Sequence, residues 1–208
     1  MKNKDIIISK LTPFIEGRAV VRVKIESSVA DFLEKEKEGL IDKSGDFIIP
    51  PFYDLIKYEG GNHVAVNIGF GEVFDEHGNC IAEESGKWGI VDLNNHILIP
   101  LKYAGMWPWN NASCFSVEYE NKWGAVNIFG ETIIPFEYEW LSIPDEYGYI
   151  TAQKDKKYGC ISMSGEVLIS FIYDELDMPV CREDRELIPV RCGLECFYIN
   201  RSGKRMFE

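Results

Sequence analysis

The sequence predicts an all-β fold built from about five copies of one short unit. Three observations support this prediction. A Lys-aromatic-Gly sequence occurs three times, and its glycines, Gly89, Gly124 and Gly159, recur every 35 residues. Each glycine is followed by a turn sequence and then by an apolar, β-branched run. Helix-forming patterns are nearly absent, and residues 28–36 are the one helical candidate.

Each unit is expected to contain three strands and a short fourth one. The first strand precedes the glycine, as at 114–119, and the second carries it. A hairpin turn such as Asp42-Lys43-Ser44-Gly45 follows, where Asp and Ser bond to nearby backbone and Gly supplies a positive φ. The third strand is an apolar run such as 97–99 that ends at a proline. A short fourth strand is expected after a recurrent tyrosine, as at 54–58.

We expect one domain over residues 1–208. A duplicated turn pattern at 73–78 indicates an extra hairpin in the second unit. The units are expected at approximately 18–58, 63–107, 114–143, 148–178 and 186–208.

One unit is too small to bury its own apolar face, so neighbouring units are expected to stack. The stack closes into a propeller-like ring or stays an open β-solenoid. The chain begins with a sequence similar to the second half of a unit and ends just after the first half of one. Complementary halves favour the ring, in which the two termini share a sheet.

The chain is acidic. It carries 34 acidic and 22 basic residues, a formal net charge of −12. A surface this negative repels nucleic acid and anionic membranes, so we expect neither as a partner, whereas it attracts a basic protein. The alternative is that the acidity only maintains solubility. No apolar run approaches the roughly 20 residues of a membrane-spanning helix or the 7–15 of a signal peptide, so we expect a cytoplasmic protein.

The residues that carry catalysis or bind metals show no recognisable motif. The six cysteines form no CxxC pair, and Cys192 and Cys196 have no histidine near them in sequence. The three histidines, His63, His77 and His96, have no nucleophile motif beside them. We therefore expect no catalytic residue, no metal and no cofactor.

The order Lys-Trp-Gly, Ile/Val-Asp, turn, Ile-Ile-Pro and Tyr-Asp resembles the bacterial WG-repeat family. It is clearest at Trp88-Gly89 and Trp123-Gly124, degenerate at Tyr158-Gly159 and Gly39, and nearly lost at Phe197. The resemblance covers almost the whole chain from about residue 18. It implies a β-repeat scaffold and brings no known catalytic residue.

The repeated aromatic residues are interpreted as packing residues. Each tryptophan is expected to pack between units, and each following glycine to permit close backbone approach. The recurrent tyrosines are expected to pack as well: Tyr53, Tyr103, Tyr138 and Tyr173.

Residues that break the repeat are better guides to function. The segments after the recurrent tyrosines are expected to gather on one side and carry aromatics among carboxylates, as a protein-binding surface requires. Trp107-Pro108-Trp109 is the candidate anchor. The alternative is that the tryptophans are buried and the acids merely solvated. The candidate partner-binding residues are Asp54, Glu59, Trp107, Trp109, Glu139, Trp140, Asp145, Glu146, Asp174, Glu175 and Asp177.

The leading hypothesis is a non-enzymatic protein-binding module with a basic protein partner. In its most specific form this is an acidic immunity-type protein that neutralises a basic toxin, such as a nuclease. One alternative is a carbohydrate- or cell-envelope-binding β-repeat protein. Another is a propeller-type glycosidase, which requires two carboxylates that face each other in one pocket.

Overall fold

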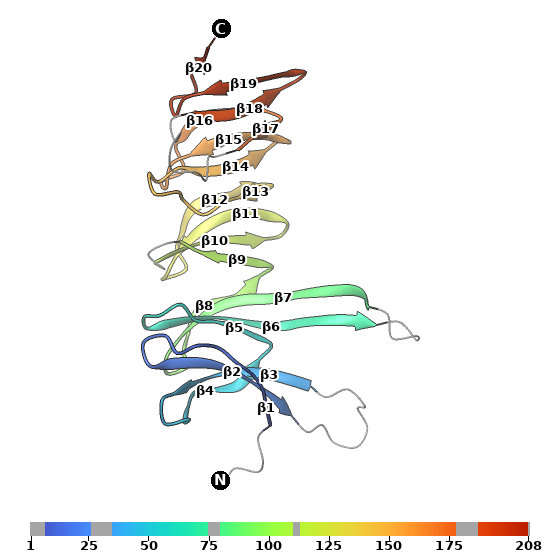
Figure 1. Ribbon diagram of the computed structural model, residues 1–208, viewed down its shortest axis with the longest axis vertical. Helices are drawn as coiled ribbons and strands as arrows, with labels where there is room; N and C mark the ends of the chain where they lie inside the picture. Colours follow the sequence, from blue (N-terminus) through green and yellow to red (C-terminus); the bar gives the residue numbers. More distant parts are fainter. Residues whose placement is uncertain (1–6, 26–34, 75–79, 110–112, 178–186, 208) are drawn as a thin grey trace. The chain divides into compact units, whose positions relative to one another are not determined.

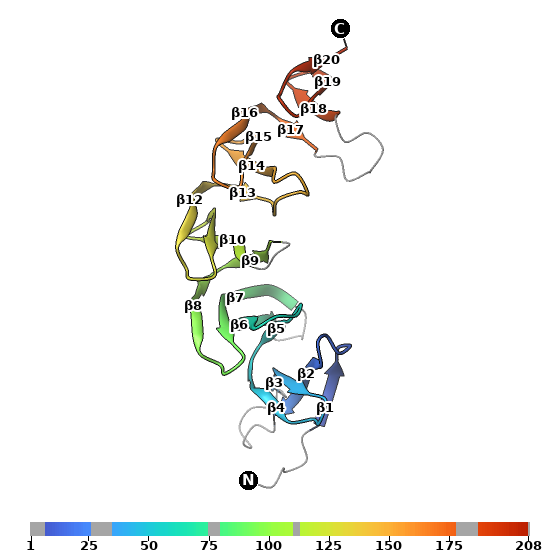
Figure 2. The same ribbon diagram turned by 90° about the vertical axis from the view of Figure 1, so that its left-hand side faces the viewer.

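The computed structural model describes residues 7–25, 35–74, 80–109, 113–177 and 187–207. Every helix or strand among these residues is a β-strand (Figures 1 and 2), which confirms the predicted all-β class. The helical candidate at 28–36 lies outside the described residues except for its end, where Lys35 and Glu36 begin a strand.

The strands form five antiparallel sheets of four strands each, and every sheet uses strands that are consecutive in the chain. The first sheet comprises β1 (Ile7–Leu11), β2 (Arg18–Ile25), β3 (Lys35–Asp42) and β4 (Phe47–Tyr53). The second comprises β5 (Leu55–Lys57), β6 (His63–Phe74), β7 (Cys80–Asp92) and β8 (Ile97–Tyr103). The third comprises β9 (Gly105–Pro108), β10 (Cys114–Tyr119), β11 (Lys122–Asn127) and β12 (Thr132–Tyr138).

The last two sheets have the same order. The fourth comprises β13 (Trp140–Leu141), β14 (Ile150–Lys154), β15 (Lys157–Ile161) and β16 (Val167–Tyr173). The fifth comprises β17 (Glu175–Leu176), β18 (Ile188–Cys192), β19 (Glu195–Ile199) and β20 (Arg205–Met206). β6 and β7 form a long hairpin, and their pairing continues as far as Phe74 and Cys80. The extra hairpin was predicted in this place.

The boundaries of the sheets differ from the predicted units. The short strand after each recurrent tyrosine was assigned to the end of a unit, but it pairs with the strand that follows it and opens the next sheet. After Tyr53, for example, the Asp54 N–H already donates to the Asn67 carbonyl of the second sheet at 2.9 Å. The tyrosine therefore ends one sheet, and the next residue begins another.

The two terminal sheets are each complete. β1 supplies the fourth strand of the first sheet, and β20 supplies the fourth strand of the fifth sheet. Both sheets are therefore formed by strands that are close in sequence. The detail of the ring prediction in which the two termini share one sheet is therefore wrong. The half-unit at the start of the chain pairs locally with β2 instead.

The hairpin turns follow the predicted chemistry. The Asp42 carboxylate accepts hydrogen bonds from the N–H groups of Ser44 and Asp46, at 2.8 and 3.1 Å, and Gly45 has a φ of 85°. An Asp, Asn or Ser side chain makes the same pair of bonds in the other four sheets, at Asp92, Asn127, Ser162 and Asn200. A side chain that bonds two and four residues ahead fixes each turn and so the register of both strands.

The repeated glycine is required by close backbone approach, as predicted. A Cβ atom on Gly89 would lie 2.6 Å from the Ile99 carbonyl oxygen, and one on Gly124 would lie 2.7 Å from that of Ile134. The strand register shifts at this point in the first four sheets. The shift brings the neighbouring backbone too close for any side chain.

The chain divides into two compact halves, Met1–Ala104 and Gly105–Glu208. In the N-terminal half, apolar side chains of the first sheet, such as Leu40 and Ile49, pack on Val64 and Val66 of the second. In the C-terminal half, one cluster joins the third and fourth sheets and another joins the fourth and fifth. The recurrent tyrosines are buried, which confirms that they are packing residues: Tyr53, Tyr103, Tyr138 and Tyr173.

Candidate functional site

Three of the predicted partner-binding acids occupy one repeat position, directly after the recurrent tyrosine. Asp174 shows their arrangement: its Oδ1 atom accepts from Lys157 Nζ at 2.6 Å, and its Oδ2 atom accepts from the Gly193 N–H at 2.7 Å. Lys157 belongs to the fourth sheet, whereas Gly193 lies in the β18–β19 turn of the fifth. The carboxylate therefore joins two neighbouring sheets. The hydrogen bond from Lys157, followed by that from the Gly193 N–H, lowers the pKa of Asp174.

The same geometry recurs at the other two positions. Asp54 accepts from Lys37 Nζ at 2.5 Å and from the Gly69 N–H at 2.7 Å, and so joins the first and second sheets. Glu139 lies 3.7 Å from Lys122 Nζ and accepts from the Lys156 N–H at 2.8 Å, and so joins the third and fourth. We call Asp54, Glu139 and Asp174 the carboxylate clamps. After the second sheet, the equivalent position is Ala104, which has no carboxylate.

Two further predicted residues also have intramolecular partners. The Asp145 carboxylate accepts from the N–H groups of Tyr147 and Tyr149 through one oxygen and pairs with Arg201 at 2.9 Å through the other. Glu175 pairs with Arg191 across β17 and β18 at 2.6 Å, and the bond from Arg191 lowers the pKa of Glu175. These contacts have structural roles that the sequence analysis did not anticipate.

The structure corrects the prediction that Trp109 is a surface anchor. Its side chain is 3% exposed and packs between the third and fourth sheets. The indole Nε1–H donates to Ser116 Oγ at 2.9 Å, and Ser116 Oγ donates in turn to the Ser142 carbonyl. Because both polar groups are satisfied inside the protein, Trp109 is a core residue.

The remaining candidates form an exposed surface on the C-terminal half. Trp107 lies on β9, Trp140 on β13, and Glu175 and Asp177 lie on or directly after β17. Each of these strands is the edge strand of its sheet, and in Figure 2 the three lie on the side of this half opposite β12 and β16. We call these four residues the edge surface. Glu146 is exposed in the β13–β14 connection, while Glu59 is exposed in the N-terminal half.

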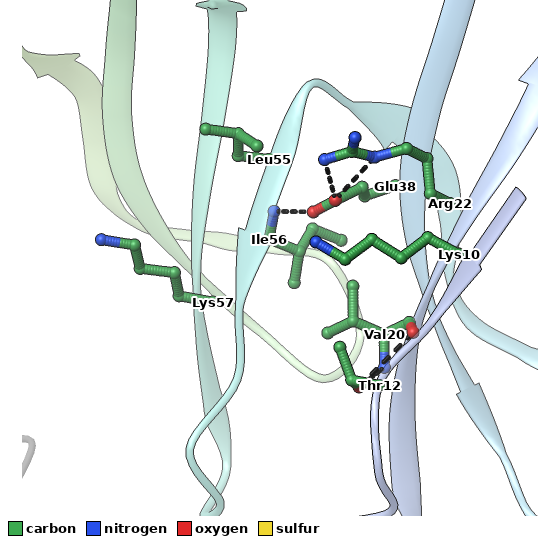
Figure 3. A pocket seen from close by; sticks show the side chains of 8 residues that line it. All are labelled: Lys10, Thr12, Val20, Arg22, Glu38, Leu55, Ile56 and Lys57. Atoms are coloured by element: carbon green, nitrogen blue, oxygen red, sulfur yellow. Dashed lines mark hydrogen bonds and ion pairs between the residues drawn. The ribbon is translucent and has the colours of Figure 1, made fainter.

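A pocket between the first two sheets was not predicted from the sequence. It has a volume of about 150 Å³ and lies in the N-terminal half (Figure 3). The signal for it was visible at Glu38, an acid at the position where the second, third and fourth units have a tryptophan or tyrosine. Its lining residues are Lys10, Thr12, Val20, Arg22, Glu38, Leu55, Ile56 and Lys57.

The described part of the chain contains no cluster of three or more His, Cys, Asp or Glu side chains with the spacing of a metal site. The described residues also include no helix of the length and apolarity needed to cross a membrane. Cys80 and Cys181 lie outside this description of side chains, and Cys114, Cys160, Cys192 and Cys196 are free thiols.

Comparison with known proteins identifies the repeat. A family model described as "WG containing repeat" matches residues 39–69, 88–123, 123–158 and 158–193. No similar protein was found among the curated proteins. A crystal structure described as that of "the eukaryotic initiation factor" is similar with a TM-score of 0.54 and 9% identity, over 96% of this chain and 54% of that chain. The chain thus spans about half the length of that structure, and at this identity the likeness concerns the fold alone. The family and fold are those of a β-repeat module of the protein-binding type. Since the matched residues make up most of the sequence, the chain belongs to the WG-repeat family.

Proposed function

We propose that the chain is a non-enzymatic binding protein that captures a basic protein through its edge surface. The observation that carries this proposal is the exposure of Trp107 and Trp140, which are 53% and 42% exposed, on the edge strands of consecutive sheets. Trp88 and Trp109 are buried in the same chain. Large aromatic side chains on a surface are the residues that most often dominate a protein interface, because a partner desolvates a large area around them.

The charges beside these tryptophans favour a basic partner. Asp177 is exposed and forms no ion pair among the described residues. Glu175 is exposed too, but Arg191 partly neutralises it. The formal net charge of −12 adds a long-range attraction for a positively charged protein. Electrostatics would accelerate the encounter, and the tryptophans would slow dissociation.

The specific form of the proposal is an immunity-type protein of the cytoplasm that neutralises a basic toxin. A basic nuclease must present a positive surface to its nucleic acid substrate. An acidic surface with aromatic anchors would compete for that surface and block the active site. Charge and exposed aromatics support this role.

The test is a pull-down from lysate of the source organism, eluted with rising salt, with three proteins compared. The wild type is expected to retain a basic protein that elutes only at high salt. The variant with Trp107→Ala and Trp140→Ala is expected to lose that protein. Phe129→Ala is the matched control, because Phe129 is 80% exposed but lies in the β11–β12 turn, outside the edge surface. It is expected to bind as the wild type does.

Two results would decide against the proposal. If the double variant still retained the same protein, the edge surface would not be the binding site. If no variant retained a protein at any salt concentration, the exposed tryptophans would fit a sugar-stacking role better. Inhibition of the captured protein's nuclease activity by the wild type, but not by the double variant, would support the immunity role.

A further inference from the structure

In each of the first four sheets, strand pairing aligns one residue of every strand with the recurrent tyrosine. We call these aligned residues the row of the sheet. In the second sheet, strand pairing aligns Leu55, Asn67 and Trp88. The first sheet has a different row, in which Lys10, Arg22 and Glu38 are aligned in the same way. The equivalent rows of the third and fourth sheets are Gly105–Glu118–Trp123 and Trp140–Gln153–Tyr158. Each of these rows ends on the recurrent tyrosine of its sheet, but the first sheet alone among the four has no second aromatic residue, because Glu38 stands where the others have Trp88, Trp123 or Tyr158.

The third sheet shows where the indole ring of the repeated tryptophan lies. A Cβ atom on Gly105 of β9 would come within 2.8 Å of Trp123 Cη2, although Trp123 is on β11. The indole therefore extends along the row over β10 and reaches the edge strand. In the first sheet Glu38 replaces this tryptophan, so no indole extends from β3 over β2 towards the edge strand β1.

The pocket lies at this row of the first sheet. Its walls are the side chains of the row together with Val20 and with Leu55 and Ile56 of the second sheet (Figure 3). Its volume is about 150 Å³. A cavity of this size is known to hold one benzene ring in an engineered protein core. The pocket is therefore large enough for a single six-membered ring.

The charges of the pocket favour an anion. Glu38 is 5% exposed and fully engaged: Oε1 accepts from Arg22 Nε and Nη2 at 3.0 and 2.7 Å, and Oε2 accepts from the Ile56 N–H at 2.6 Å. Lys10 also lines the pocket, and no described carboxylate lies within ion-pair distance of its ammonium. Lys57 completes the lining, and its Nζ atom lies 4.8 Å from the centre of the Trp88 ring.

Lys57 is exposed, and Figure 3 shows its side chain directed away from Lys10 and Glu38. Lys10 and Arg22 line the pocket together with Glu38, whose carboxylate already has partners, although the chain as a whole is strongly acidic.

We propose that this pocket binds a small aromatic carboxylate of the size of benzoate. Its ring would take the place that the indole fills in the third sheet, against Val20, Leu55 and Ile56. Its carboxylate would pair with the ammonium group of Lys10. This site lies in the N-terminal half and is independent of the edge surface.

The test is a titration of the full chain with sodium benzoate, followed by ¹⁵N–¹H NMR. We expect saturable shifts confined to β1, β2, β3 and β5, with a Kd on the order of 1 mM, as suits a ligand of few atoms. Benzyl alcohol, which lacks the charge, and acetate, which lacks the ring, are each expected to bind about tenfold more weakly. Benzylamine, which carries the opposite charge, is expected not to bind.

Variants locate the site. Lys10→Met is expected to weaken benzoate binding about threefold to tenfold, since it removes one ion pair and keeps the aliphatic stem. Lys204→Met, which changes an exposed lysine of the C-terminal half, is the charge-matched control and is expected to leave the Kd unchanged. Glu38→Trp restores the residue of the repeat, fills the pocket and is expected to abolish binding.

The proposal is overturned if Lys10→Met and Lys204→Met bind benzoate equally, or if the shifts lie outside these four strands. It is also overturned if acetate binds as tightly as benzoate, because the pocket would then recognise charge without a ring. The Lys10→Met comparison decides the matter even if Glu38→Trp does not fold, because Lys10 is exposed and tolerates substitution.

Discussion

Asp174 receives a hydrogen bond from Lys157 at 2.6 Å through one carboxylate oxygen and one from the Gly193 N–H at 2.7 Å through the other. The first bond reaches back to the fourth sheet, and the second is made with the fifth. Hydrophobic clusters bury the faces between these sheets, but apolar contact has no direction. The carboxylate clamp adds directional hydrogen bonds between the two sheets.

The clamp at Asp174 predicts a pH dependence of stability. Its partners lower the pKa of Asp174 below the ordinary value of 3.8, so folding favours the ionised carboxylate. The stabilisation is therefore complete above about pH 4 and is lost as the pH falls through the lowered pKa. Asp174→Asn should lower Tm at pH 7 and bring the wild-type and variant curves together towards pH 2–3. Thermal unfolding followed by circular dichroism measures this, and a Tm difference that is constant with pH would contradict it.

The clamp at Asp54 predicts a larger loss, because its side chain is mostly buried. The carboxylate has partners in both sheets of the N-terminal half. Asp54→Ala should reduce the free energy of unfolding by about 1.5–3 kcal/mol, the range for hydrogen bonds to charged groups. Glu59→Ala removes an exposed acid close by and should change it by less than about 0.5 kcal/mol. Urea denaturation of the two variants compares these values, and equal losses would show that Asp54 has no special structural role.

The clamps show what the sequence could and could not predict. The repeat itself, the turns and the packing tyrosines follow from patterns within one unit, so they were predicted correctly. Asp54, Glu139 and Asp174 were also found by pattern, but they were interpreted as partner-binding residues. Their partners, such as Gly193 for Asp174, lie in the next sheet, and only the stacking geometry brings them together.

The same limit applies to the two neighbouring tryptophans. Trp107 and Trp109 are two residues apart, and alternation along a strand places them on the same face. β9 ends at Pro108, however, so Trp109 leaves the strand and enters the core between two sheets. Glu38 was read only as a degenerate repeat position, although an acid in place of a buried ring was the sequence signal for the pocket.

The glycine of the repeat predicts a position that tolerates no side chain. In Gly89→Ala the new methyl group would meet the Ile99 carbonyl oxygen at 2.6 Å and the backbone of Leu101 at 2.9 Å, and backbone moves less readily than a side chain. We expect the free energy of unfolding to fall by about 1–3 kcal/mol. Gly71 of the same sheet has open space around it, so Gly71→Ala should have little effect. Denaturation midpoints that were equal for both variants would contradict the close-approach explanation.

Trp107 and Trp109 should respond differently to truncation. Trp109→Ala removes a buried ring and leaves the Ser116 hydroxyl without its donor, so we expect a loss of about 3–5 kcal/mol in unfolding free energy. Trp107→Ala removes a ring that is half exposed and should cost about 1 kcal/mol or less. Guanidinium denaturation followed by circular dichroism measures both. A comparable loss for Trp107→Ala would mean that Trp107 is required for folding, and it would remove the basis for treating it as a binding residue.

The buried thiol of the fourth sheet predicts a pattern of cysteine reactivity. Cys160 takes the core position that Leu40, Ile90 and Ala125 hold in other sheets, and burial raises its pKa to about 11. The thiolate is the nucleophile, so at pH 8 only about one molecule in a thousand carries the reactive form at Cys160. Cys196 is exposed on β19. Native protein treated with iodoacetamide at pH 8 should become labelled at Cys196 while Cys160 is still unmodified, as measured by peptide mass spectrometry. In guanidinium both thiols should be labelled. Equal labelling of the two thiols in the native protein would mean that the fourth and fifth sheets separate readily, because Cys160 packs between them.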